Sequence, residues 1–442
     1  MTAPISWLWA VPFLGLLFTF ACAPLLAPPL WHRHYRWWTA LWSLAFLLPA
    51  AGIDGPGAVL NAVLATALLQ YLPFILLLGA LFAVAGGLRI TGTPRGGALV
   101  NTALLALGTL LASIIGSTGA ALLTIRPLAR ANRHRRYSRH VFVFLILLVA
   151  NVGGALTPLG NPPIFLGFLA GVPFFWPLVH LWAPTALVAG GLLASFYMLD
   201  RHLFRRRGGG PALLPEIEKL GLEGGVNLVL LALIIAAVML RAFWHPAAAL
   251  SLPGFRWEAE VMIADALLLA AALLSLALTP RQTRQRNDFA WTPMIEVAIL
   301  FAGVFITLLP VTAMIAAGPA GPAAALFERL LSGGMPIDGR FYWATGLLSA
   351  FLDNAPAYLV FFDFAGGDAA RLTQAVPRTL AAISAAAAYF GAFTYLGNAP
   401  NLLIKRLAER QGIAMPQFFG YVGWSILCLL PWLLLVQAIF FA

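Results

Sequence analysis

The stretch TPLGNPPIFL occupies residues 157–166, and a closely similar stretch, TYLGNAPNLL, occupies residues 394–403. Both fit the pattern T-x-L-G-N-x-P, and they lie 237 residues apart. Apolar sequence flanks each of them. Glycine permits tight backbone geometry and proline removes a backbone donor, so each stretch predicts an interruption in a helix. One such interruption could be a simple packed kink, but a matched pair indicates a shared purpose.

The composition indicates that both stretches lie in a membrane. Of the 442 residues, 61% are hydrophobic and 10% are charged, with a mean hydropathy of +0.88, whereas soluble domains carry about 25% charged residues. The sequence therefore predicts an all-α polytopic membrane protein. Cys22 and Cys428 lie in apolar runs and indicate neither a disulfide framework nor a metal site. The N-terminal segment lacks a basic region, which favours a retained first helix over a cleaved signal peptide.

A spanning helix needs about 20 mostly apolar residues. On that criterion we expect ten spans, at 6–29, 38–53, 66–88, 142–168, 181–199, 225–243, 260–279, 293–317, 378–404 and 415–440. Two further apolar segments, about 98–128 and about 341–365, are each divided by a small polar cluster, GSTGA at 116–120 and LDNAPA at 352–357. We expect both to be re-entrant hairpins with the polar cluster at the tip.

The net charge of +11 comes from basic clusters that border the apolar segments. If the N-terminus lies outside and both hairpins return to the side they leave, 21 of the 27 basic residues face the cytoplasm. The positive-inside rule describes this asymmetry, which collapses if either hairpin is a full span. The charge therefore indicates cytoplasmic loops beside a lipid bilayer and not a partner nucleic acid.

A polar connection at 205–224 divides the chain into two halves, 1–204 and 225–442. Each half holds five expected spans and one hairpin, and this odd number of spans inverts the second half relative to the first. The hairpin tips follow nearly the same offset as the interrupted helices, since aligning Ser117 with Asp353 gives 236. Two inverted-topology repeats, with unwound segments near 157–163 and 394–400, predict a secondary transporter.

These segments also resemble a known family. SIIGSTGAALLTIRPL, NVGGALTPLGNPPIFLGFLAG, IEVAILFAGVFITLLPV and SAFLDNAPAYLVFF are similar to the ion transporter superfamily, in particular to NhaD-type sodium/proton antiporters and the related citrate transporters. The resemblance covers roughly residues 60–440. It implies hairpin tips that meet the unwound helices at mid-membrane, and a homodimer whose transport domains shift like elevators. Asn161 departs from the family pattern, because close relatives often carry an acidic residue there.

The second hairpin tip holds the main candidate for an ion-carrying residue. Asp353 is one of few deep acidic residues, and a charge at the centre of a membrane helix costs about 2.5–3.5 kcal/mol. Its carboxylate can hold a sodium ion, or a proton because desolvation disfavours the charged form. The alternative is that Asp353 only caps the following helix. The residues expected around it are Asn354, Thr394 and Asn398 from its own half, and Ser117, Thr118, Asn151, Thr157 and Asn161 from the other.

Within this set, we expect Asp353, Asn354 and Asn161 to be ligands of the sodium ion. Asn151 faces either the site or a neighbouring helix. Glu296 lies near the cytoplasmic start of a span, where it is a candidate proton relay or gate, or an ordinary ion-paired or interfacial acid.

The pattern favours a sodium/proton antiporter in which Asp353 carries the ion and the proton in turn. The alternative is a sodium- or proton-coupled carrier of citrate, a dicarboxylate or another anion held by helix N-termini, although Asp353 would repel an anion unless it is neutralised. An enzyme is disfavoured, because H-E-x-x-H, Walker, nucleophile-elbow and Cys/His patterns are missing. A scaffold is disfavoured by the matched interruptions. We therefore expect no cofactor beyond the transported Na⁺ and H⁺, a homodimer, and a multi-pass location in a bacterial inner membrane.

Overall fold

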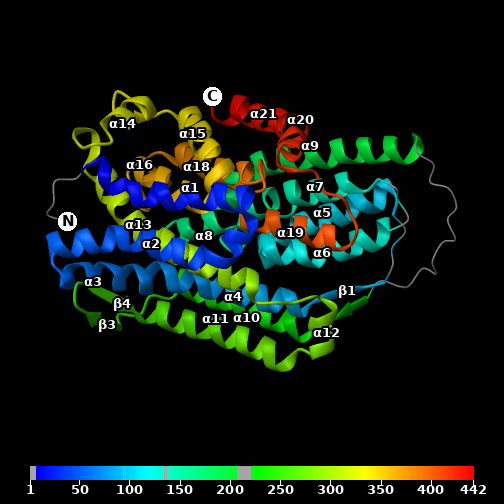
Figure 1. Cartoon of the computed structure of the whole chain (residues 1–442), viewed down its shortest axis with the longest axis horizontal. Coiled ribbons are helices and arrows are strands. Elements are labelled where there is room, and N and C mark those ends of the chain that lie inside the picture. Colours follow the sequence, from blue (N-terminus) through cyan, green and yellow to red (C-terminus); the bar gives the residue numbers. More distant parts are fainter. Residues whose placement is uncertain (1–5, 93, 95, 134, 136, 207–220) are drawn as a thin grey trace.

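The computed structural model describes residues 6–92, 94, 96–133, 135, 137–206 and 221–442. Within these ranges the chain is almost entirely helical, and its strands form three two-stranded ribbons (Figure 1). The protein is thus an all-α polytopic membrane protein. Most of the polar connection expected at 205–224 lies outside the described residues.

The helices of the first half are η1 (Trp7–Ala10), α1 (Val11–Leu26), α2 (Pro28–Asp54), α3 (Pro56–Thr66), the π-helical turn η2 (Ala67–Tyr71), α4 (Leu72–Gly87), α5 (Ala98–Ile115), α6 (Ser117–Asn132), α7 (Arg139–Leu148), η3 (Val152–Leu156), α8 (Pro162–Leu169) and α9 (Trp176–Arg206). Those of the second half are α10 (Val226–Phe243), α11 (Ala259–Leu278), α12 (Arg281–Arg286), α13 (Thr292–Ala316), η4 (Gly318–Ala320), α14 (Ala324–Leu330), α15 (Asp338–Leu352), α16 (Asn354–Phe364), α17 (Ala369–Gln374), α18 (Pro377–Phe390), α19 (Ala399–Arg410), α20 (Phe418–Cys428) and α21 (Leu430–Phe440).

Three antiparallel ribbons join neighbouring helices. They pair β1 (Arg89–Thr91) with β2 (Gly221–Glu223), β3 (Ala249–Leu252) with β4 (Phe255–Glu258), and β5 (Leu331–Ser332) with β6 (Met335–Pro336). Among the described residues, only the first ribbon pairs segments far apart in the chain, because β1 follows α4 and β2 lies at the end of the 205–224 connection, just before α10. Ile90 stands opposite Leu222 in its register.

Eight helices of the described chain are long and apolar enough to cross a bilayer, or nine if the bent pair α20–α21 is one span. Seven of the ten expected spans coincide with these helices, and the expected span 415–440 is the bent pair. The expected span 38–53 lies within the longer α2, and 378–404 comprises α18 and α19. Helix α5 also meets the length criterion, so composition alone does not distinguish a hairpin arm from a span.

Both segments expected to be hairpins are helical hairpins. Gly116 alone separates α5 from α6, and Asp353 alone separates α15 from α16. The two arms of each pair pack against each other. The turn falls at the polar cluster in both, as the sequence predicts.

The helices that carry the T-x-L-G-N-x-P pattern are interrupted, which confirms that prediction. Helix α7 ends at Leu148, and the chain becomes regularly helical again in α8 from Pro162, with the short η3 between. Helix α18 ends at Phe390, and α19 begins only at Ala399. Proline stands in the first turn of α8 and of α19, where its missing N–H costs nothing.

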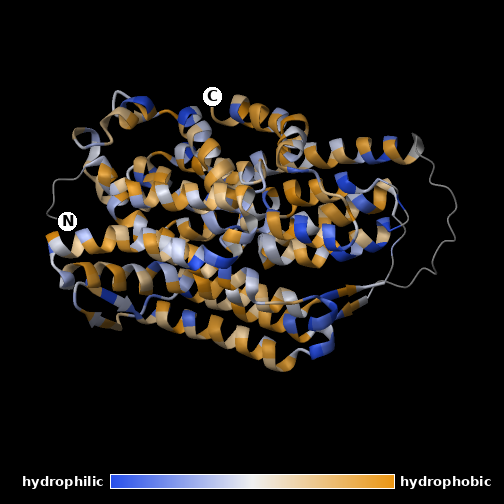
Figure 2. Ribbon diagram, viewed as in Figure 1, coloured by the Kyte–Doolittle hydropathy of each residue, from blue (hydrophilic) through white to orange (hydrophobic). Residues whose placement is uncertain are grey.

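Each half contributes to two groups of packed helices. Helices α1 and α2 pack on α13, and α4 packs on α10 and α11. The hairpins and interrupted helices form the second group, in which α5 packs on η3, α15 on α18, and α16 on α8. Figure 1 shows α10 and α11 along one side of the molecule, away from α5 to α9. Hydrophobic residues cover most helices, whereas hydrophilic residues dominate α12 (Figure 2).

Candidate functional site

A cavity of about 200 Å³ lies where both hairpin tips and both interrupted helices meet. The tips contribute 115–119 and 351–353, and the interruptions contribute 158–162 and 395–400. Apolar side chains from α1, α4 and α13 complete the wall, among them Phe20, Leu77 and Phe301. Such a wall excludes water and strengthens the electrostatic interactions of the few polar groups inside.

The two hairpin turns have nearly the same backbone conformation. Gly116 has φ 79° and ψ 147°, and Asp353 has φ 75° and ψ 143°. The residues that correspond are therefore Gly116 and Asp353, which are 237 residues apart, as are the interrupted helices. The alignment of Ser117 with Asp353 was wrong by one residue; Ser117 corresponds to Asn354, the first residue of the returning helix.

The carboxylate of Asp353 caps α16 and also lines the cavity. Its Oδ1 accepts a hydrogen bond from the backbone N–H of Ala355 at 3.1 Å. The capping role that the sequence suggested is thus present. Because a carboxylate offers two oxygens and about four lone pairs, this bond leaves acceptor capacity on the same side chain that faces the cavity.

Five buried asparagines connect the two halves, two of them in the cavity wall and three behind it. Asn354 donates to Oδ1 of Asn161 at 3.1 Å, and Asn161 donates to the backbone oxygen of Asn151 at 3.4 Å. The Oδ1 of Asn151 accepts from Asn398 at 3.0 Å, and its Nδ2 donates to Oδ1 of Asn401 at 2.8 Å. Asn151 therefore faces its neighbours and does not line the cavity, and it bridges the two interruptions.

Matched threonines hold each interruption against its own hairpin. Thr157 donates to the backbone oxygen of Ser113, and Thr394 donates to the backbone oxygen of Ala350. Both pairs obey the offset of 237. The first threonine of each T-x-L-G-N-x-P pattern thus satisfies a carbonyl at the end of a hairpin arm, where a helix leaves its last carbonyls without partners.

One feature near the second tip suits a cation. The Oδ1 of Asn354 is buried and has no hydrogen-bond partner among the described residues. Amide oxygens are ligands for hard cations, and a free buried amide oxygen is otherwise costly.

Two charged side chains line the cavity away from the tips. Glu296 on α13 accepts a hydrogen bond from Nε1 of Trp31 at 2.9 Å. Arg406 on α19 also lines the cavity and is exposed. The charge pattern of the sequence assigns both residues to the cytoplasmic half of the protein.

The structure brings together all ten side chains that the sequence singled out, in two layers. Asp353, Ser117, Thr118, Asn161, Asn398 and Glu296 line the cavity. Asn354, Asn151, Thr157 and Thr394 lie behind it, in the hydrogen bonds described above. Sequence reasoning missed Asn401, whose position three residues after Asn398 in an apolar helix was the available signal. It also missed Trp31, for which the sequence holds no signal.

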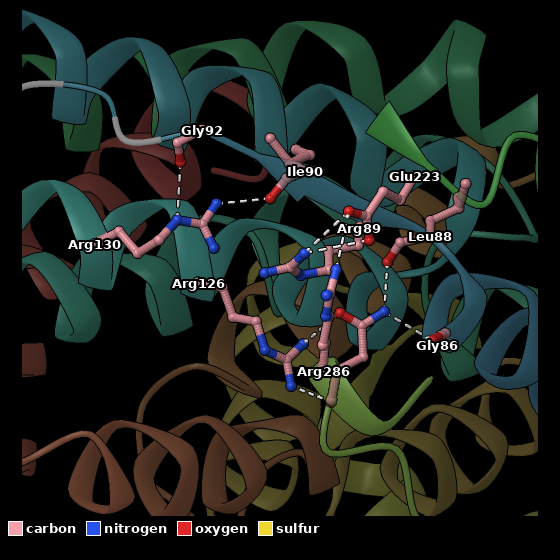
Figure 3. A network of polar contacts seen from close by, with 10 residues as sticks. Gly86, Leu88, Arg89, Ile90, Gly92, Arg126, Arg130, Glu223 and Arg286 are labelled. Carbon is pink, nitrogen blue, oxygen red and sulfur yellow. Dashed lines mark hydrogen bonds and ion pairs between the residues drawn. The ribbon is translucent and has the colours of Figure 1, made fainter. Parts of the chain in front are cut away.

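Arginines on α6 tie the first hairpin to the ends of other helices (Figure 3). Arg130 donates to the backbone oxygens of Ile90 at 2.6 Å and Gly92 at 2.9 Å. Arg126 donates to the backbone oxygen of Asn287 and, at 3.3 Å, to its side-chain oxygen. Asn287 in turn donates to the oxygens of Gly86 and Leu88, at the end of α4.

Comparison with known families agrees with this architecture. A family profile described as "Putative citrate transport" matches residues 2–441, which is nearly the whole chain. A comparison with curated proteins found no match. The chain forms a transporter with paired helical hairpins and interrupted helices around one cavity, and it belongs to the putative citrate transport family.

Proposed function

We propose that the protein is a sodium/proton antiporter in which Asp353 binds the sodium ion and the proton alternately. The observation that carries this proposal is the position of Asp353, whose carboxylate stands at a hairpin tip in the cavity where both tips and both interrupted helices meet. A carboxylate in an apolar cavity favours a bound cation or a proton over the bare charge.

The sodium ligands in this proposal are Asp353, Asn354 and Asn161. The unpaired Oδ1 of Asn354 supports this assignment, because it offers a buried oxygen one residue from the carboxylate. Asn161 supplies Oδ1 at 3.1 Å from the Asn354 amide. Sodium binding would then compete with protonation of Asp353, which is what obligatory exchange requires. Glu296, exposed to the same cavity, is the proposed proton relay.

The arrangement in the membrane is part of the proposal. The two halves, 1–204 and 225–442, act as inverted repeats with re-entrant hairpins, and the N-terminus lies outside. The matched dihedral angles of Gly116 and Asp353 and the matched threonine bonds support this symmetry. A homodimer in a bacterial inner membrane, with an elevator-like shift of the hairpins and interrupted helices, completes the proposal.

The test is ion exchange in everted membrane vesicles. Sodium or lithium added outside should dissipate a preformed pH gradient, and Asp353→Asn should abolish this response. Asp368→Asn is a matched control, because Asp368 also caps a helix, accepting from the backbone of Ala370 at 2.9 Å, but does not line the cavity. An equal loss of exchange activity in both variants would contradict the proposal, and so would full exchange activity in Asp353→Asn.

A second candidate function is a sodium- or proton-coupled carrier of citrate or another small carboxylate. Citrate is the substrate that the description of the matched family names, and Arg406 gives the cavity one cationic side chain that attracts an anion. The N-termini of α6, α8, α16 and α19 all meet the cavity, where their partial positive charge favours anions. Sodium-dependent uptake of labelled citrate, weakened in Arg406→Gln, together with no response of the pH gradient to sodium alone, would establish this function instead.

A further inference from the structure

A second cavity, of about 560 Å³, lies outside the candidate transport site. Its lining residues are 129, 130, 132, 133, 135 and 137–139, around the end of α6 and the start of α7, and 410–414, at the end of α19 and after it. It therefore joins segments from both halves of the chain. Small-molecule sites have volumes of about 300–1,000 Å³, so it is large enough for a ligand.

Arginine dominates the lining of this cavity. No acidic residue stands among its lining residues, and five arginines do: Arg130, Arg133, Arg135, Arg139 and Arg410. The charge pattern of the sequence assigns this side of the protein to the cytoplasm.

Two of the five arginines already have hydrogen-bond or ion-pair partners within the protein. Arg135 pairs with buried Asp200 at 2.6 Å, and His140 shares the same carboxylate oxygen at 2.8 Å. The Arg135 guanidinium also lies over the ring of Phe204, 4.8 Å from its centre. Arg130 donates to the backbone of β1 and of Gly92, as Figure 3 shows. The charges of these two side chains are therefore committed to the fold.

The side chains of the other three arginines have no such partner among the described residues. The side chains of Arg133, Arg139 and Arg410 are exposed and make no hydrogen bond or ion pair with any residue that the structure describes. Glu409, the neighbour of Arg410, is held by Lys405 at 2.7 Å. Three like charges around one hollow repel each other, and an anion placed between them removes that cost.

The helix geometry adds to the positive potential. Helix α7 begins at Arg139, and Ser138 before it makes no side-chain capping bond. Both residues line the cavity. The first N–H groups of a ten-residue helix thus stand at the cavity without a side-chain cap, and the N-terminal end of a helix favours anions.

We propose that this cavity binds a phosphate-bearing anion, and that Arg133, Arg139 and Arg410 are its ligands. Guanidinium groups bind phosphate oxygens in bidentate pairs, and three of them around one hollow suit a multiply charged tetrahedral group better than a single carboxylate. The phosphate could belong to a soluble compound or to a phospholipid headgroup of the adjacent leaflet. The proposal is independent of which ion the transport site carries.

The experiment measures thermal unfolding of the full chain in detergent, titrated with sodium pyrophosphate against sodium chloride of equal ionic strength. A parallel titration adds phosphatidylglycerol, with phosphatidylcholine as its reference. A shift of the unfolding midpoint with pyrophosphate assigns a soluble phosphate, and a shift only with phosphatidylglycerol assigns a headgroup. Whichever compound shifts the midpoint, its affinity should fall by about tenfold in each of the variants Arg133→Gln, Arg139→Gln and Arg410→Gln.

Arg281→Gln is the matched control, because Arg281 is an exposed arginine that the charge pattern assigns to the same side but that does not line the cavity. The Arg281→Gln variant should bind the phosphate compound with the same affinity as the unaltered protein. Three results would overturn the proposal: no shift with either phosphate compound, equal weakening in Arg281→Gln, or a shift with citrate as large as that with pyrophosphate. Unchanged unfolding of the variants without ligand would show that they are folded.

Discussion

Asp353 adopts almost the same backbone conformation as Gly116, although 237 residues separate them. Glycine populates this region freely, whereas a side chain there is strained by about 1–3 kcal/mol. The first half therefore turns its hairpin without strain, and the second half places a carboxylate at the strained position. Such strain persists only where the surroundings enforce it, and it is common at binding sites.

We expect Asp353→Gly to fold at least as stably as Asp353→Ala. Glycine relieves the strain and alanine retains it, while both lose the capping bond to Ala355, worth about 1 kcal/mol. Unfolding midpoints in detergent compare the two variants, and both should lack sodium/proton exchange. A less stable glycine variant would mean that the turn is not strained.

The reverse substitution at the other tip gives a second prediction. Gly116→Ala should destabilise the protein by about 1–2 kcal/mol, because alanine has to adopt a positive φ. A β-carbon there would meet only Leu81 and the oxygen of Leu159, at 3.3 and 3.4 Å, so crowding adds little. Unfolding midpoints are again the measurement. Gly190→Ala, within α9 and with open space around it, should not destabilise the protein.

Removal of the Asn151 amide should cost more than removal of the Asn161 amide. Asn151→Ala leaves the oxygens of Ile146 and Asn401 without their 2.8 Å donors in a buried region, at about 1–3 kcal/mol for each unpaired group. The side-chain bonds of Asn161 are longer, at 3.1 and 3.4 Å. Thermal unfolding ranks the variants. The opposite order would show that Asn151 is not the bridge between the halves.

Arg126→Ala should destabilise the protein much more than Asp288→Asn. Arg126 donates to both oxygens of Asn287, whereas its contact with Asp288 is 3.5 Å long and the Asp288 side chain is 68% exposed. Exposed ion pairs contribute about 0–1 kcal/mol. Thermal unfolding in detergent compares the two variants. Comparable losses of stability in both would assign the stabilisation to the ion pair between Arg126 and Asp288.

Glu296→Gln should slow transport and leave stability unchanged. Glutamine keeps an oxygen that accepts from Trp31 but cannot carry a proton. Trp31→Phe should do the opposite, lowering stability by about 1 kcal/mol with a smaller effect on rate. Initial rates in vesicles and unfolding in detergent separate the two roles. Full transport in Glu296→Gln would exclude it as a relay.

The sequence located the interruptions and the tips because these depend on local chemistry. Proline, glycine and small polar residues in an apolar run have few other interpretations, so the non-helical stretches before Pro162 and Ala399 were predictable. The capping role of Asp353 follows from the same local reasoning.

Features that depend on distant contacts were not predictable. The alignment of Ser117 with Asp353 failed by one residue because sequence similarity ignores the sign of φ, which pairs Gly116 with Asp353. The contact of Trp31 with Glu296 joins residues 265 apart. Periodicity and hydropathy describe one helix at a time, so this contact has no trace in them.

The pairing of β1 with β2 bears on how the molecule is assembled. The two halves are held by this ribbon and by helices that interleave throughout, so continuity of the chain between 207 and 220 adds little to their attachment. A polypeptide severed there should reconstitute from two co-expressed fragments. Such a pair would let the two halves be labelled separately.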